Sequence, residues 1–103
     1  MESYEITLCD PDTSEVIVAE SGDIMETRLE YGSIRLVDLA LGLAFTWFCG
    51  MQGRDSLPFF RDAAAELDDY SSSCTCGPGS AKLTLKHMIA FAEERPDGVW
   101  EIW

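Results

Sequence analysis

A long apolar segment, residues 34–49, is the feature that most limits what this chain can fold into. Its apolar side chains cover nearly every face of a helical projection: Ile34, Leu36, Val37, Leu39, Leu41, Leu43, Phe45, Trp47 and Phe48. A helix that is apolar all round has to be buried all round. Because the segment has few β-branched residues, it favours a buried central helix over the alternative of two buried strands. We expect Ser33 to cap this helix and Gly50 to end it.

The same segment is too short to cross a membrane. Its longest uninterrupted stretch, residues 39–52, falls below the roughly 18–20 residues that a span needs, and Arg35 and Asp38 lie close by. The N-terminus is acidic, where a secretion signal would be basic, and no small-residue cleavage site follows an apolar run. We therefore expect a cytoplasmic protein whose four Cys are thiols.

Three strands are predicted before this helix. Apolar and polar residues alternate over residues 4–9, as in a half-buried strand, and a turn cluster follows at residues 10–14. The β-branched residues 16–18 predict a second strand that forms a hairpin with the first. Alternation over residues 25–31 predicts a third antiparallel strand, which Gly32 ends.

Two more helices and a closing strand complete the prediction. A polar loop is expected at residues 50–57, and Ser56 and Pro58 predict that a second helix begins there. Its apolar stripe is formed by Phe60, Ala63, Ala64, Leu67 and Tyr70. Residues 71–80 are a connector, and Ser80 caps a third helix with the stripe Leu85, Met88, Ile89 and Ala92. Residues 99–103 return as a strand to the N-terminal strands. The order β-β-β-α-α-α-β predicts one α+β domain over residues 1–103, with an antiparallel sheet packed on the central helix.

The net charge of the chain limits which partners it can bind. The chain of 103 residues has 19 Asp and Glu against 7 Lys and Arg, a net charge of −12. Residues 1–32 alone hold nine acids and one Arg, so two thirds of the net charge lie in the first third of the chain. Such a protein is repelled by nucleic acid and by anionic membranes, which excludes direct binding to either.

The acidic residues also suggest a binding surface. Neighbouring strands lie about 4.8 Å apart, so outward-facing Glu5, Glu15, Glu26 and Glu30 would form an acidic lattice on the sheet. Loop acids and the solvent face of the second helix would extend this lattice, because they are equally acidic. The full set of expected partner-binding residues is Glu5, Asp10, Asp12, Glu15, Glu20, Asp23, Glu26, Glu30, Asp62, Glu66 and Asp69. A surface that serves solubility alone would more often intersperse Lys, yet solubility remains the alternative explanation.

Residues suited to catalysis or metal binding are sparse. Cys74 and Cys76 are separated by one residue, whereas zinc sites space paired thiolates by two or more. His87, the single histidine, lies beside the apolar stripe of the third helix, and no phosphate-binding glycine motif is present. We therefore expect no metal site, no cofactor and no enzymatic activity. The alternative is a small metal- or thiol-dependent module built on these three residues.

In size and composition, though not by motif, the chain resembles the small acidic inhibitors made by bacteria and their phages. These include immunity proteins against nuclease toxins and anti-CRISPR proteins. The resemblance implies a non-catalytic inhibitor that imitates nucleic acid by its charge and binds a basic nuclease or nucleic-acid-binding complex. The chain would act as a monomer or homodimer. A structural homodimer is a further alternative, because the alternation of residues 99–103 puts Trp100 and Trp103 on opposite faces of the last strand.

Overall fold

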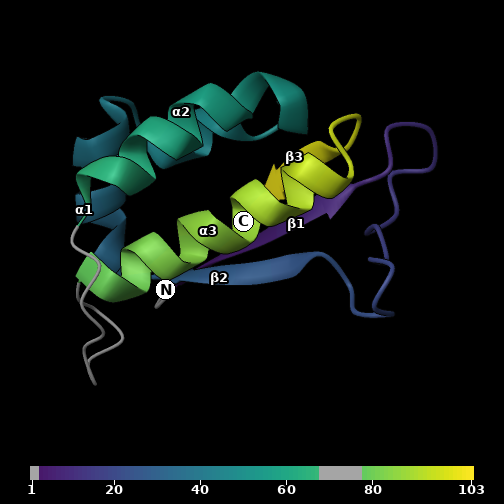
Figure 1. Ribbon diagram of the computed structural model, residues 1–103, viewed down its shortest axis with the longest axis horizontal. Helices are drawn as coiled ribbons and strands as arrows, with labels where there is room; N and C mark the ends of the chain where they lie inside the picture. Colours follow the sequence, from purple (N-terminus) through teal and green to yellow (C-terminus); the bar gives the residue numbers. More distant parts are fainter. Residues whose placement is uncertain (1–2, 68–77) are drawn as a thin grey trace.

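A three-stranded antiparallel sheet forms one layer of the protein (Figure 1). The computed structural model describes residues 3–67 and 78–103. The strands are β1 (Ser3–Cys9), β2 (Glu26–Glu30) and β3 (Val99–Ile102), in the order β2-β1-β3. The first strand is thus the central one, and the last strand of the chain pairs with it.

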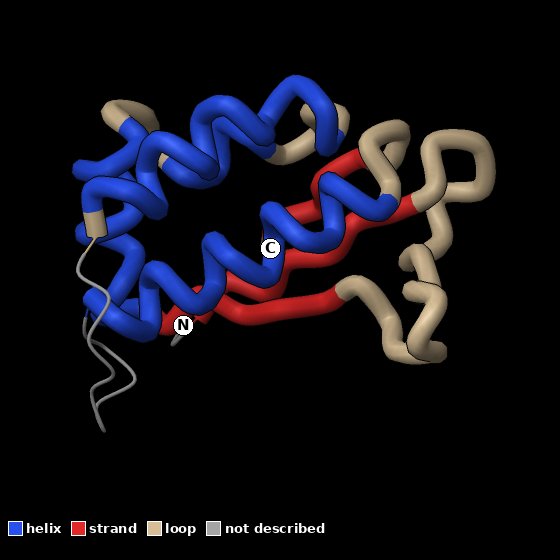
Figure 2. Tube along the Cα trace, viewed as in Figure 1, coloured by secondary structure: helices blue, strands red, loops and turns tan. Residues whose placement is uncertain are grey.

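Helices form the second layer (Figure 2). They are α1 (Tyr31–Leu41), the short 3-10 helix η1 (Phe45–Phe48), α2 (Gly53–Glu66) and α3 (Pro78–Glu94). In Figure 1, α3 runs along the front of the strands and α2 lies beside it. Among the described residues, no helix is both long and apolar enough to cross a membrane.

The core lies between the two layers, and period-two alternation explains which strand residues reach it. Ile6 and Leu8 of β1, Leu29 of β2, and Trp100 and Ile102 of β3 point into it and are buried. The helices contribute three aromatic rings to the same cluster, from Phe45, Phe48 and Phe60. The ring of Phe60 meets Trp100 edge-on, with centroids 5.8 Å apart.

Trp100 also joins the two layers by a hydrogen bond. Its indole Nε1 donates to Ser56 Oγ at 2.8 Å, and that hydroxyl donates to the carbonyl of Gly53, also at 2.8 Å. Both Trp100 and Ser56 are fully buried, so each polar group finds its partner inside the protein rather than in water. The backbone of β3 is hydrogen-bonded along both edges. One edge pairs with β1, and at the other edge Trp100 N–H donates to the Met51 carbonyl at 3.0 Å.

The predicted fold class is confirmed: the protein is a small α+β domain with an antiparallel sheet and three helices. The third predicted strand is β2, and the closing strand pairs with one of the N-terminal strands as expected; the structure shows that this strand is β1. The stripe on α3 is also confirmed, since Leu85, Met88 and Ala92 are buried and Ile89 is half-buried.

The second predicted strand is the main difference within the sheet. Residues 16–18 do not form a strand, and Val16 and Val18 instead make isolated bridges to Cys9 and Ile24. β2 therefore pairs directly with β1, and residues 10–25 form an excursion between them. This excursion projects beyond one end of the sheet in Figure 2.

The prediction of one helix over residues 34–49 is wrong. The helix begins at Tyr31, with Glu30 rather than Ser33 at its N-cap position, and it ends at Leu41. Gly42 adopts a left-handed conformation with φ 73°, which glycine reaches without strain. The chain then forms η1, and Phe45 N–H donates to the Asp38 carboxylate at 2.8 Å. Leu39 and Trp47 are exposed, so the segment is not buried all round.

The second helix begins earlier than predicted, at Gly53, and Pro58 lies beyond its first turn. Its stripe is confirmed at Phe60, Ala63 and Ala64, which are buried. Asp69, Tyr70 and residues 71–77 of the predicted connector lie outside the described residues. The predicted connector is wrong at residues 78–80, because α3 begins at Pro78 and Ser80 lies inside the helix rather than at its N-cap.

Removing the Ser56 hydroxyl tests how far the two layers depend on this hydrogen bond. We expect Ser56→Ala to lower the free energy of unfolding by about 1–3 kcal/mol, because the buried Trp100 N–H loses its acceptor. Urea denaturation followed by tryptophan fluorescence measures the change. Ser21→Ala, at an exposed position, serves as the control. Equal stability of the two variants would contradict the assigned role.

Candidate binding surface

The side of the sheet that faces away from the helices, here called the outer face, gathers acidic residues from all three strands. Alternation places Glu5 and Thr7 of β1, Glu26 of β2 and Glu101 of β3 on this side, opposite the buried core residues. Thr7 is paired with Glu26 on one neighbouring strand and with Glu101 on the other. Two carboxylates thus flank a threonine that is only 3% exposed.

A single basic residue of the described strands lies on this face. Arg28 is paired with Glu5 in the β1–β2 register, and its Nη2 lies 3.2 Å from Glu5 Oε1. Both side chains are substantially exposed, so the ion pair contributes little to stability. Because Glu30 lies two residues farther along the same strand, on the same side, the outer face keeps an excess of negative charge.

Apolar residues extend the outer face at the excursion. Residues 16–25, here called the bridged segment, are held by hydrogen bonds from Ile17 N–H to the Leu8 carbonyl and from Met25 N–H to the Ile17 carbonyl. Ile17 and Met25 are buried in the core. Alternation therefore turns their neighbours Val18 and Ile24 to the opposite side, where they are 59% and 53% exposed.

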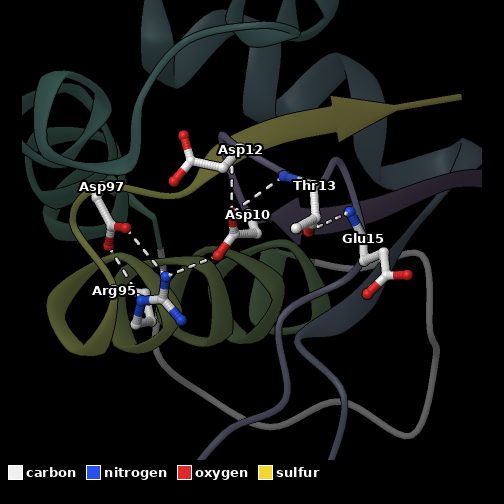
Figure 3. Close-up of polar contacts among 6 residues, drawn as sticks. All are labelled: Asp10, Asp12, Thr13, Glu15, Arg95 and Asp97. Carbon is white, nitrogen blue, oxygen red and sulfur yellow. Dashed lines mark hydrogen bonds and ion pairs between the residues drawn. The ribbon is translucent and has the colours of Figure 1, made fainter.

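The loop that precedes the bridged segment is fixed by Asp10 (Figure 3). Its Oδ1 accepts the N–H groups of Asp12 at 2.8 Å and Thr13 at 3.2 Å, and its Oδ2 lies 3.3 Å from Arg95 Nη2. Arg95 also pairs with Asp97 at 3.0 Å. Asp10 therefore acts as a clasp between this loop and the end of α3.

These contacts change the acidity of both carboxyl groups. The backbone N–H groups of Asp12 and Thr13 lower the pKa of Asp10, and Arg95 lowers it further. The hydrogen bond from Arg95 likewise lowers the pKa of Asp97. Both groups favour the ionised form, and the guanidinium between them offsets part of their charge.

The predicted partner-binding residues fall into separate groups. The structure brings Glu5, Glu26 and Glu30 together on the outer face. Asp12 and Glu15 lie with Asp10 in the loop. The prediction that Glu15 lies on a strand is therefore wrong. Glu20 and Asp23 lie in the turn of the bridged segment. Asp62 and Glu66 lie on the exposed surface of α2, which packs against α1 and α3. Asp69 lies outside the described residues.

Glu101 belongs to the outer face but was not among the predicted residues. The signal was present in the sequence, because residues 99–102 alternate and both neighbours of Glu101 point into the core. Trp103 follows on the same side as Glu101. It is 60% exposed, and its backbone pairs with Glu5.

Of the three residues in the alternative metal or thiol module, His87 alone lies in the described part of the chain. His87 is exposed, and its Nδ1 lies 3.2 Å from Thr27 Oγ1. Cys74 and Cys76 lie outside the described residues. Of the other two thiols, Cys9 is buried and Cys49 is exposed. Within residues 3–67 and 78–103, no group of three His, Cys, Asp or Glu side chains could hold a metal ion.

Comparison with known protein families, with curated proteins and with solved structures found no match. The open outer face is therefore the feature from which a function has to be argued.

The Asp10 clasp predicts a specific dependence of stability on pH. A carboxyl group with a lowered pKa in the folded state stabilises the protein above its unfolded pKa of about 3.9, and this contribution is lost as the pH falls through the folded value. Asp10→Asn removes the titration. We expect wild type to be more stable than the variant near neutral pH and this advantage to shrink below about pH 4. Urea denaturation at a series of pH values measures it, and an advantage independent of pH would contradict the assignment.

Proposed function

We propose that this protein is a small, non-catalytic inhibitor whose outer face binds the basic surface of a nucleic-acid-binding protein and keeps nucleic acid away from it. One observation carries the proposal: carboxylates from three strands share a sheet face that no described helix covers. The position of these acids on a rigid sheet supports recognition, because strands hold their side chains at fixed spacings.

The carboxylates of the outer face are close enough together to attract the same basic surface. Glu26 and Glu101 lie on strands either side of β1, so their backbones are about 10 Å apart, and Glu5 lies two residues along the central strand. At physiological salt the screening length is about 8 Å, so a basic group placed over β1, about 5 Å from each neighbouring strand, is attracted by the carboxylates on both sides. A surface built to bind phosphates is basic, and such an array of carboxylates competes for it.

Charge also favours a basic protein over a second copy of this chain. Two outer faces in contact would bring like charges together, which costs stability. A basic partner instead gains attraction at every carboxylate, and electrostatic steering speeds its association. The excess of acids over bases on the outer face is compensated when such a partner binds.

Charge reversal at two positions tests the proposal. We expect the double variant Glu26→Lys, Glu101→Lys to bind the partner at least about tenfold more weakly, because it replaces attraction by repulsion on both sides of Thr7. The melting temperature should stay equal or rise, since repulsion within the face is relieved. Immobilised wild type and variant, incubated with lysate of the native host, report which proteins each retains.

Asp62 and Glu66 were predicted from the sequence to bind the partner, but they lie on α2 rather than on the outer face, so this proposal does not include them. The matched control is therefore the double variant Asp62→Lys, Glu66→Lys, which changes the net charge by the same amount. We expect it to retain the same proteins as wild type. A retained protein, once purified, should also release its nucleic acid when the inhibitor is added. Retention by the outer-face variant, selective loss in the α2 variant, or unchanged nucleic-acid binding would each overturn the proposal.

A further inference from the structure

The bridged segment presents an apolar pair within an excursion whose charged residues are all acidic. Val18 and Ile24 lie opposite each other in an isolated antiparallel bridge, and more than half of each side chain is exposed. Single exposed apolar residues are common on protein surfaces, but these two are adjacent and on the same side of the sheet. Together they form one apolar spot at the projecting end of the outer face.

The backbone around this spot is well ordered by hydrogen bonds. Ala19 N–H donates to the Asp23 carbonyl at 2.8 Å, and Gly22 N–H donates to the Ala19 carbonyl at 2.9 Å. Gly22 has a φ of 95°, which suits glycine in the tight turn. The buried side chains of Ile17 and Met25 anchor both arms to the core. The apolar pair is thus presented without a large entropy cost on binding.

Acidic residues surround the pair in the sequence. Glu20 lies two residues after Val18, Asp23 directly precedes Ile24, and Glu26 follows it by two. Glu94 adds a fourth carboxylate, because its Oε2 accepts the Glu20 N–H at 3.1 Å. The segment from residue 10 to residue 26 contains no Lys or Arg.

We infer that the Val18–Ile24 pair is the apolar anchor of this surface, and that its occupant is a segment of a basic protein in which an apolar side chain is flanked by Lys or Arg. This inference rests on the proposed function and assigns its central contact. Apolar contacts surrounded by charged ones are typical of binding hot spots, since the apolar centre supplies affinity and the charged rim supplies specificity. Charge complementarity selects a basic occupant over a second copy of the chain.

Two short synthetic peptides of equal positive charge test the anchor. One alternates Lys with Leu and the other alternates Lys with Ser, and isothermal titration measures the affinity of each. We expect the Lys–Leu peptide to bind wild type about tenfold more tightly. In Val18→Thr, Ile24→Thr this preference should disappear. Thr keeps the β-branched shape and strand propensity, so the fold is retained, and a thermal melt verifies this.

Leu83→Gln is the matched control, because Leu83 on α3 is 54% exposed, almost the same as Ile24. It should keep the preference for the Lys–Leu peptide. Equal binding of both peptides to wild type, or loss of the preference in the Leu83 variant alone, overturns the inference but leaves the proposed function standing. Binding of neither peptide at low salt overturns both. A wild-type dimer in light scattering that Val18→Thr, Ile24→Thr dissolves overturns the basic occupant in favour of a second copy.

Discussion

The contact between Trp100 and Ser56 is the interaction on which the two-layer arrangement depends. The indole ring fills the centre of the core, and its N–H reaches the hydroxyl of a helix residue that is itself fully buried. Because the hydroxyl bonds onward to the Gly53 carbonyl, the first turn of α2 is fixed relative to β3. The last strand of the chain is thereby joined both to the helices and, through its backbone, to the central strand β1.

The described helices pack on one side of the sheet, and this arrangement determines which residues the other side can carry. The apolar strand side chains of the core cluster pack against the helices, so the outer face is left mainly to residues that tolerate water. Charged residues are stable there because they stay solvated. The charged strand residues on this face are four acids, Glu5, Glu26, Glu30 and Glu101, and one base, Arg28. Val18 and Ile24 are exposed apolar neighbours. This combination of charged and apolar residues is the basis on which we propose a basic partner.

Much of this fold could be predicted from the sequence, because alternation and helical periodicity record which side chains face the core. β2, α3 and the return of β3 to the N-terminal strands follow from such patterns. The end of α1 could not be placed from apolar periodicity alone. It is decided by the left-handed Gly42 and by the Asp38 carboxylate, which accepts the Phe45 N–H. Residues 16–18 read as a strand, yet turns on either side leave them only isolated bridges.

The candidate surface was predictable to a similar degree. Glu5, Glu26 and Glu30 were placed together correctly, since strand alternation determines their side of the sheet. Asp10 was expected to bind a partner, but its position next to Arg95 depends on contacts 85 residues apart in the chain, which local patterns do not record. The exposed Val18–Ile24 pair also depends on tertiary structure, because it requires Ile17 and Met25 to reach the core.

The proposed function requires the outer face to be open to solvent, and NMR with a neutral, soluble paramagnetic chelate measures this accessibility directly. Such a probe broadens the signals of groups that solvent can reach. We expect strong broadening of the Val18 and Ile24 methyl signals and of the Trp103 indole signal, and no broadening of the Trp100 indole signal. Methyl groups of Val18 and Ile24 as protected as the Trp100 indole would contradict it.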